Sequence, residues 1–280
     1  MISRRNLKRL FYKSARQPLY AFSVFKRRIK AYLCYSFKKG KSVYPEAITL
    51  FLTHRCNLQC RMCGQWGKEG VTKKRGAQYV QSELTADQLR SVVDGLSSFK
   101  SNITLFGGEP LLHQDCIDII KYIKQKGLHC LVITNGFLIE ELAKQLVDSG
   151  LDELNVSLDG NAVLHDEIRG MKGLFDKITN GLKQIHHFKA EMKKLKPFVN
   201  LQCTITQYNY NHLEQLIDVA GEANADSLTF HNLIFLDSTL LAEQRRYDKM
   251  LGCDSVDWEG FVFKPGINPQ VLYEKMKKIL

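Results

Sequence analysis

The sequence predicts an α/β fold in which six β/α repeats form one parallel sheet that curls. Three observations lead to this prediction. Short apolar or β-branched segments, most of them bounded by Gly, Asp or Asn, recur between residues 47 and 230. Segments with the apolar periodicity of helices lie between them. The chain has 280 residues, 44% of them hydrophobic, which is enough for one large domain with a sizeable core. A helix that connects one strand to the next lets both strands run in the same direction, so the sheet is parallel, and such crossovers are right-handed.

Residues 1–44 form a basic arm. Residues 1–45 hold 13 of the 40 Lys and Arg and no Asp or Glu, so the rest of the chain is nearly neutral. This distribution argues against a nucleic-acid partner for the body of the protein. Pro18 suits the start of a helix. The arm also has a helically spaced apolar stripe with basic residues between its members, formed by Phe22, Phe25, Ile29, Leu33 and Phe37.

Two interpretations of this stripe stay open. It inserts into an anionic membrane surface with its cations on the headgroups, or it packs on the barrel while the charges are solvated. No apolar run reaches the roughly 18–20 residues needed to span a bilayer. An organelle transit peptide has a similar basic, acid-free composition. We expect a cytoplasmic protein, with peripheral membrane contact as the first interpretation of the arm.

The strands and helices alternate in order along the body. Strands are predicted at 47–52, 103–106, 129–134, 153–158, 198–204 and 226–230. Helices are predicted at 83–96, 115–126, 138–149, 173–188 and 210–223. The helix at 83–96 is the clearest, since Thr85 and Gln88 form a capping-box pattern ahead of a leucine and valine stripe.

Two stretches lie outside this alternation. Residues 65–81 are polar and contain glycine, so we expect a loop that acts as a mobile cover. Residues 232–280 are expected to close the barrel, with a final helix that starts at Asn268-Pro269 and reaches Leu280.

Three cysteines follow the first strand with the spacing Cys-x-x-x-Cys-x-x-Cys: Cys56, Cys60 and Cys63. Thiolates are soft ligands that suit iron–sulfur clusters and zinc. A cubane cluster usually takes four cysteines, so three would leave one iron open to a small molecule. The alternative is a closed zinc site that adds His54.

The other cysteines are scattered singly, and we expect each to be a small buried hydrophobe. They are Cys34, Cys116, Cys130, Cys203 and Cys253. Free thiols fit a reducing cytosol.

Polar residues follow the next strands, where α/β barrels gather their catalytic groups. After the second strand, Gly107 and Gly108 allow close backbone approach, and Glu109 can accept hydrogen bonds from an ammonium. Thr134 follows the third strand. Ser157 ends the fourth strand.

Asp159 and Arg169 come shortly after the fourth strand. Asp159 either binds a ribose or substrate or caps the next helix. Arg169 either meets a ligand carboxylate or makes a surface ion pair with Asp166 or Glu167. We expect His165 to be structural.

His231 and Asn232 stand near the end of the sixth strand. Polar residues there face the place where a substrate would lie.

This ordered set of motifs resembles the radical S-adenosylmethionine (SAM) enzymes over residues 45–231. Met62 stands where the family usually has an aromatic residue. The resemblance implies a partial TIM-like (β/α)6 barrel, in which Cys56, Cys60 and Cys63 hold a 4Fe–4S cluster. The cofactor-binding residues that it implies are Gly107, Gly108, Glu109, Thr134, Ser157, Asp159 and Arg169.

The resemblance also implies an activity. One electron from the cluster cleaves bound SAM, and the 5′-deoxyadenosyl radical that results removes hydrogen from a substrate. The substrate is expected to be a small molecule or a peptide, and the electron donor a protein such as flavodoxin or ferredoxin. Only Cys253 follows Cys203, so the cysteine-rich extension of many peptide-modifying members is not expected here. The alternative is a non-catalytic binding or scaffold protein with the same barrel.

Overall fold

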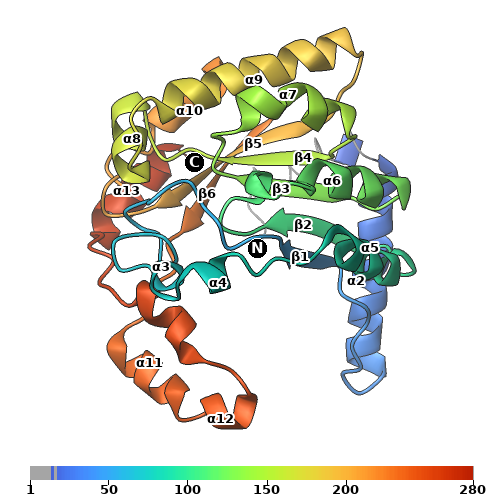
Figure 1. Cartoon of the computed structure of the whole chain (residues 1–280), viewed down its shortest axis with the longest axis horizontal. Coiled ribbons are helices and arrows are strands. Elements are labelled where there is room, and N and C mark those ends of the chain that lie inside the picture. The colour runs from blue at the N-terminus through green and yellow to red at the C-terminus, as the bar shows by residue number, and fades with distance from the viewer. Residues whose placement is uncertain (1–13, 16–17, 280) are drawn as a thin grey trace.

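The computed structural model describes residues 14–15 and 18–279 of the chain. Its centre is a sheet of six parallel strands in the order β1-β2-β3-β4-β5-β6, curled into part of a barrel (Figure 1). The strands are β1 (Ala47–Phe51), β2 (Asn102–Phe106), β3 (Cys130–Thr134), β4 (Glu153–Ser157), β5 (Phe198–Ile205) and β6 (Ser227–Asn232). The predicted partial (β/α)6 barrel is confirmed, and all six predicted strands are present.

Helices connect the strands, and they include most of the helices that we predicted. The main ones are α5 (Ala86–Ser97), α6 (Cys116–Gln125), α7 (Ile139–Asp148), α8 (Ala162–Arg169), α9 (Leu174–Glu191), α10 (Gln215–Glu222) and α13 (Pro269–Ile279). The capping box of α5 is confirmed, since Thr85 accepts from the amide of Gln88 and the Gln88 side chain accepts from the amide of Thr85.

Two helical predictions were inaccurate. The helix α10 begins later than residue 210, because the Asn209 side chain bonds the amide of Thr206 and the carbonyls of Asp159 and Thr204 instead. Such side-chain bonds compete with helix formation. The helix α8 was not predicted as a helix, although Asn161 caps its start and the left-handed Gly170 ends it.

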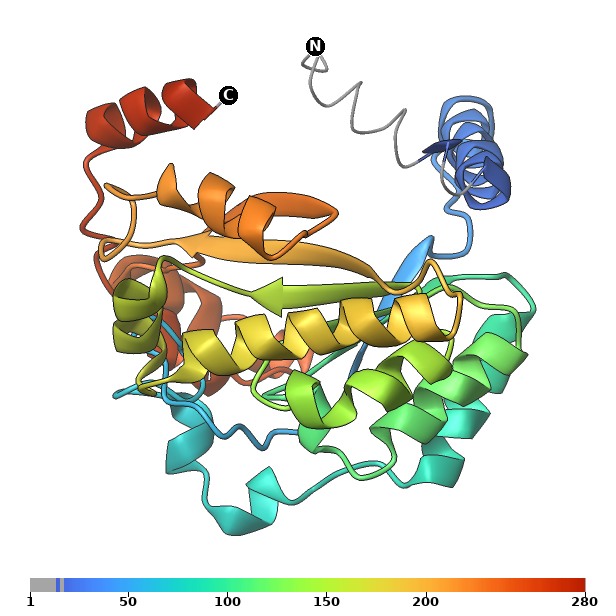
Figure 2. The same ribbon diagram turned by 90° about the horizontal axis from the view of Figure 1, so that it is seen from above.

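The core lies between the sheet and the helices. Along each strand alternate side chains face opposite sides. Those on the outer side, such as Leu105, Val132 and Val156, are 0% exposed. Helices α5, α6, α7 and α9 lie side by side over this outer face (Figure 2). The other set of side chains faces the inside of the barrel, which leaves that side free to form a site.

The stretch 65–81 has more regular structure than the loop that we expected. It contains two short helices, α3 (Val71–Lys74) and α4 (Ala77–Val80). The amide of Val71 donates to the Gly64 carbonyl. Arg75 forms ion pairs with Asp254 and Asp257 of the C-terminal segment. These contacts tie the stretch to the rest of the fold.

The segment after β6 contributes α11 (Ser238–Arg245), α12 (Asp248–Leu251) and the 3-10 helix η2 (Ser255–Phe261). The η2 helix packs on the cysteine loop. A side chain at Gly64 would come within 2.7 Å of the Phe261 ring. The C-terminal segment therefore stands over the same strand ends as the cysteines.

Helix α2 (Pro18–Phe37) lies at the side of the sheet where the strands begin (Figure 1), and Tyr20 accepts from Asn102 at the start of β2. The Arg28–Glu46 ion pair and the stacking of Tyr20 on His129, with ring centroids 4.5 Å apart, fix it there. The predicted apolar stripe is exposed, so the interpretation that it packs on the barrel was wrong. Residues 1–13 and 16–17 of the predicted arm lie outside the described residues.

Among the helices that the structure describes, none combines the length and hydropathy needed to cross a bilayer.

Candidate active site

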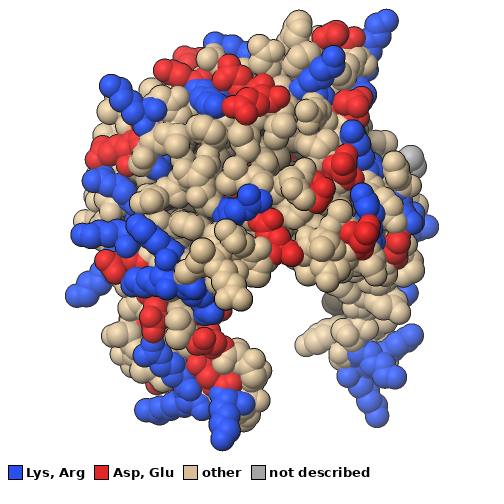
Figure 3. Space-filling model, in the orientation of Figure 1, with Lys and Arg blue, Asp and Glu red and all other residues tan. Residues whose placement is uncertain are grey.

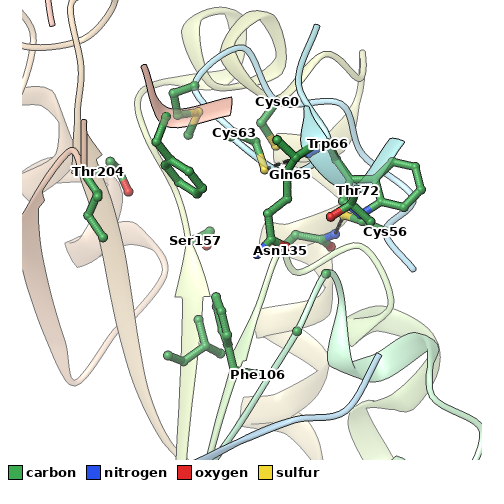
Figure 4. Close-up of a pocket in the computed structure, with 18 of the residues that line it drawn as sticks. Cys56, Cys60, Cys63, Gln65, Trp66, Thr72, Phe106, Asn135, Ser157 and Thr204 are labelled. Atoms are coloured by element: carbon green, nitrogen blue, oxygen red, sulfur yellow. Dashed lines mark hydrogen bonds between the residues drawn. The ribbon is translucent and has the colours of Figure 1, made fainter. Parts of the chain in front are cut away.

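A cavity of about 880 Å³ opens at the C-terminal ends of the strands. Its wall comes from the cysteine loop, the ends of β1 to β6, and η2. Figure 4 shows Cys60 and Cys63 near one end of the cavity, Phe106 near the other, and Ser157 between them. Its size lies within the range of about 300–1,000 Å³ that is usual for ligand pockets. The cavity is therefore large enough to hold a small-molecule ligand.

The cysteine loop holds its shape through backbone hydrogen bonds. The amide of Cys63 donates to the Cys60 carbonyl over 3.0 Å, and that of Gly67 donates to the Cys63 carbonyl over 2.9 Å. The amide of Arg61 donates to the carbonyl of Ile168 at the end of α8. The loop is thus a tight turn attached to a neighbouring element, and all three cysteines line the cavity.

Each cysteine sulfur accepts a hydrogen bond from a nitrogen donor. Asn135 Nδ2 lies 3.9 Å from the sulfur of Cys56. Arg169 Nη1 lies 3.8 Å from the sulfur of Cys60. The amide of Trp66 lies 3.3 Å from the sulfur of Cys63.

Hydrogen-bond donors that point at a sulfur stabilise its thiolate form. Such hydrogen bonds are one of the ways in which proteins set the reduction potential of iron–sulfur clusters. Burial raises the pKa of the Cys56 thiol to about 12, so a bound metal rather than the protein has to make it a thiolate. This donor set fits a 4Fe–4S cluster.

The geometry gives the zinc alternative no support. In the described part of the chain, no three His, Cys, Asp or Glu side chains converge as ligands of a single metal ion. The His54 ring lies between Phe51 and Tyr79, with centroids 4.8 and 4.4 Å away. The ring of His54 therefore packs between aromatic side chains, and its backbone carbonyl accepts from Trp66 Nε1.

The Gly107-Gly108 turn lies against the chain that leads into the cysteines. The amide of Gly108 donates to the Thr53 carbonyl over 2.8 Å. A side chain on Gly108 would come within 2.2 Å of the Arg55 carbonyl. Only glycine fits this close approach. Both glycines line the cavity, as expected of a cofactor-binding turn.

Glu109 lies behind the cavity wall. Its side chain is 0% exposed and accepts hydrogen bonds from the Thr134 hydroxyl and from the amides of Asn135 and Leu111. Burial raises the pKa of Glu109 to about 7, although these donors work in the opposite direction. Its carboxyl group holds Thr134 and Asn135 in place. The contact of Glu109 with an ammonium stays a prediction.

Asp159 is also 0% exposed, and it pairs with Arg169 over 2.6 Å. Its second oxygen accepts from the amide of Thr204. Asn161 rather than Asp159 caps α8, and the contact of Asp159 with a ribose or substrate stays a prediction. The interpretation of Arg169 as part of a surface ion pair was also wrong, because its side chain is only 9% exposed.

The partners first considered for Arg169 are engaged elsewhere. Asp166 accepts from the amides of Gly173 and Phe175, and Glu167 pairs with Arg61.

The remaining predicted residues fall into two groups. Thr134, Ser157, His231 and Asn232 line the cavity. His165 is fully buried, and its Nδ1 accepts from the amide of Asp159, which gives it the structural position that we expected.

Among the scattered cysteines, the expectation of burial was wrong for one. Cys253 is exposed, whereas Cys34, Cys116, Cys130 and Cys203 are buried.

Sequence reasoning missed several residues of the cavity wall. Asn135 stands beside the expected Thr134, and its amide reaches both Asn57 and Cys56. Trp258 and Phe261 also line the cavity. Nothing in their local sequence marks them, because only the fold brings η2 back over the cysteine loop.

The fold and this cavity define a class of barrel protein that binds its cofactors at the strand ends. The chain belongs to the radical SAM superfamily, whose family model matches residues 50–220.

Two curated relatives illustrate the range of the family. The Fe-coproporphyrin III synthase of Methanosarcina barkeri is 34% identical over 186 residues, which cover 66% of this chain and 43% of that protein. A probable GTP 3′,8-cyclase of Sulfolobus acidocaldarius is 31% identical over 226 residues, which cover 79% of this chain and 65% of that protein. In these two alignments the chain spans less than two thirds of its relatives' length.

Solved structures show the same fold. Streptococcus suis SuiB bound to S-adenosylmethionine aligns with a TM-score of 0.59 at 15% identity, covering 83% of this chain and 52% of that one. The anSMEcpe protein with bound AdoMet and Kp18Cys peptide aligns with a TM-score of 0.53 at 18% identity, covering 74% and 61%. At this level of identity the likeness concerns the fold alone.

Proposed function

We propose that the protein is a radical SAM enzyme in which Cys56, Cys60 and Cys63 hold a 4Fe–4S cluster. One observation carries the proposal: three thiols, each with its own nitrogen donor, share a cavity with Ser157 and Arg169. When bound, the cluster and SAM supply the one-electron chemistry that removes hydrogen from an unreactive carbon. The alternative is a scaffold that keeps the barrel without turnover.

The residues of the chain bind and orient the cofactor. Gly107 and Gly108 bring the backbone to the cavity wall, where Thr134 and Ser157 add hydroxyl groups. Asp159 fixes the guanidinium of Arg169, which suits a carboxylate partner. Trp66 and Phe261 cover the cysteine end and exclude water.

The substrate is a small molecule or a peptide, and it enters beside His231 and Asn232, which line the cavity at the end of β6. The two curated relatives have different names and different chemistry, so neither substrate is transferred to this chain. A protein such as flavodoxin or ferredoxin supplies the electron. Residues 45–231 form the catalytic barrel, and residues 232–280 close it.

We also propose a cytoplasmic location with peripheral attachment of residues 1–44 to anionic membrane. Helix α2 has two opposite faces. The packed face holds Tyr20, Val24, Arg27, Ala31 and Cys34. The opposite face holds the exposed apolar residues Phe22, Phe25, Ile29, Tyr32 and Leu33.

Charge supports an anionic partner for this exposed face. Lys26 and Lys30 flank it, and α2 contains no acidic residue. In Figure 3 the projecting end of α2, at the lower right, shows basic and uncharged side chains without an acidic one. Apolar side chains flanked by cations are typical of helices that lie in a membrane interface.

Production of 5′-deoxyadenosine tests the enzymatic proposal. Full-length protein is reconstituted anaerobically with iron and sulfide and mixed with SAM and dithionite, and 5′-deoxyadenosine is measured by chromatography. We expect formation that depends on both protein and dithionite. A reconstituted cluster that yields none would favour the scaffold alternative.

A further inference from the structure

The end of the cavity away from the cysteines is apolar. Phe51 and Phe106 are register partners on β1 and β2, and their rings meet edge to face with centroids 5.9 Å apart. Ile133 lies beside them on β3, one residue beyond Val132, which pairs with Leu105. All three side chains line the cavity, and Figure 4 shows Phe106 well separated from the labelled cysteines.

The same row of the sheet continues with neutral amides. Ile133 pairs in register with Asn155, and Asn155 with Asn200. Asn200 Nδ2 donates to Asn155 Oδ1 over 3.3 Å. The hydroxyls of Ser227 and Thr229 donate to Asn200 Oδ1. This row of the sheet therefore passes from hydrocarbon side chains to uncharged hydrogen-bonding groups.

Permanent charges on the described cavity wall are already paired. Arg169 is engaged by the buried Asp159, and Asp257 by Arg75. The described lining residues include no lysine. A charged ligand group at the apolar end would lose water without gaining an opposite charge, which is costly.

We infer that the substrate places an uncharged aromatic or aliphatic group against Phe51, Phe106 and Ile133, and keeps any charge at the mouth of the cavity. This substrate class rests on the proposed function, since it assumes that the cavity binds a substrate beside the cofactor. Apolar walls with a few oriented polar groups are the usual composition of sites for such groups.

A matched pair of probes tests the inference. 1-Naphthol and 1-naphthoate share one ring system, but only the second is charged at pH 7. Their dissociation constants are measured by equilibrium dialysis against the reconstituted full-length protein. The two tryptophans of the chain, Trp66 and Trp258, both line the cavity, so a change in their emission reports that a probe has entered it. We expect naphthol to bind at least tenfold more tightly than naphthoate.

The variant Phe106→Lys sharpens the test by placing a cation at the apolar end. It should reverse the preference towards naphthoate, whereas Phe22→Lys on the exposed face of α2 should leave the ratio as it is in the unchanged protein. Equal binding of the two probes to the unchanged protein, no binding of either, or the same ratio in Phe106→Lys would overturn the inference. If that variant does not fold, the comparison on the unchanged protein still decides.

The two proposals fail in different ways. Failure to form 5′-deoxyadenosine while naphthol remains preferred would reject the enzyme and keep the neutral site. Formation of 5′-deoxyadenosine with a preference for naphthoate would do the reverse.

Discussion

Two layers of polar side chains surround the strand ends, and they differ in what they can touch. The inner layer lines the cavity and includes Cys56, Cys63 and Ser157. Glu109 and Asp159 lie fully buried behind it. Each of these carboxyl groups holds residues of the inner layer, Thr134 and Asn135 in one case and Arg169 in the other. The motifs of this chain therefore combine groups that line the cavity with buried groups that hold them in place.

The largest effect is expected in the inner layer. Cys60→Ala removes one of three thiol ligands, so the protein should lose the visible absorption of the cluster and all formation of 5′-deoxyadenosine. Cys253→Ala is the matched control, because this cysteine is exposed and lies outside the cavity wall. Iron analysis of both variants checks the prediction. A Cys60→Ala protein with a full iron content would show that this thiol is not a ligand.

A large effect is also expected at the buried ion pair. Asp159→Asn leaves the Arg169 guanidinium buried without its counter-charge, and breaking a buried pair costs about 3–5 kcal/mol of unfolding free energy. Glu167→Gln is the control, since its pair with Arg61 is about half exposed and exposed pairs contribute about 0–1 kcal/mol. Chemical denaturation measures both. Equal losses in the two variants would contradict a special role for the Asp159–Arg169 pair.

A moderate effect is expected for Glu109→Gln. The new amide group would face one of the three donors that now point at the carboxyl oxygens. Losing a hydrogen bond to a charged group costs about 1.5–3 kcal/mol. SAM affinity should fall through displacement of Thr134, while the cluster remains. Calorimetric titration with SAM and a denaturation curve measure the two changes. Unchanged stability together with weaker SAM binding would support the direct contact that we first expected.

The smallest effect on stability is expected on α2, far from both layers. The pair Phe25→Ser and Ile29→Ser alters only exposed side chains, and such changes usually stay within about 0.5 kcal/mol. Sedimentation with anionic vesicles should nevertheless drop markedly and should weaken with added salt. Leu195→Ser is the control, because this exposed leucine lies outside α2. If the unchanged protein does not sediment with the vesicles, the membrane proposal is rejected.

Most of the fold follows from local patterns. The alternation of apolar strands and periodic helices sets the strand order, and the Thr85–Gln88 capping box is visible in the sequence. The cysteine loop and the Gly107-Gly108 turn were also predictable, because the cysteine spacing and the paired glycines are visible in the local sequence.

Contacts between distant segments were not predictable in the same way. Nothing in the local sequence shows that Asp159 bonds to its partner Arg169 and to the amide of Thr204. The return of Trp258 over the cysteine loop depends on the whole C-terminal segment. The distinction between lining and supporting residues is a property of packing, which sequence spacing does not encode.

The metal content of the reconstituted protein tests the central claim most directly. Three thiols that share one cluster predict about four irons and four sulfides per chain, as in a single cubane. Anaerobic reconstitution followed by iron, sulfide and zinc analysis of the desalted protein gives the numbers. About eight irons per chain, or one zinc with no visible chromophore, would contradict the account.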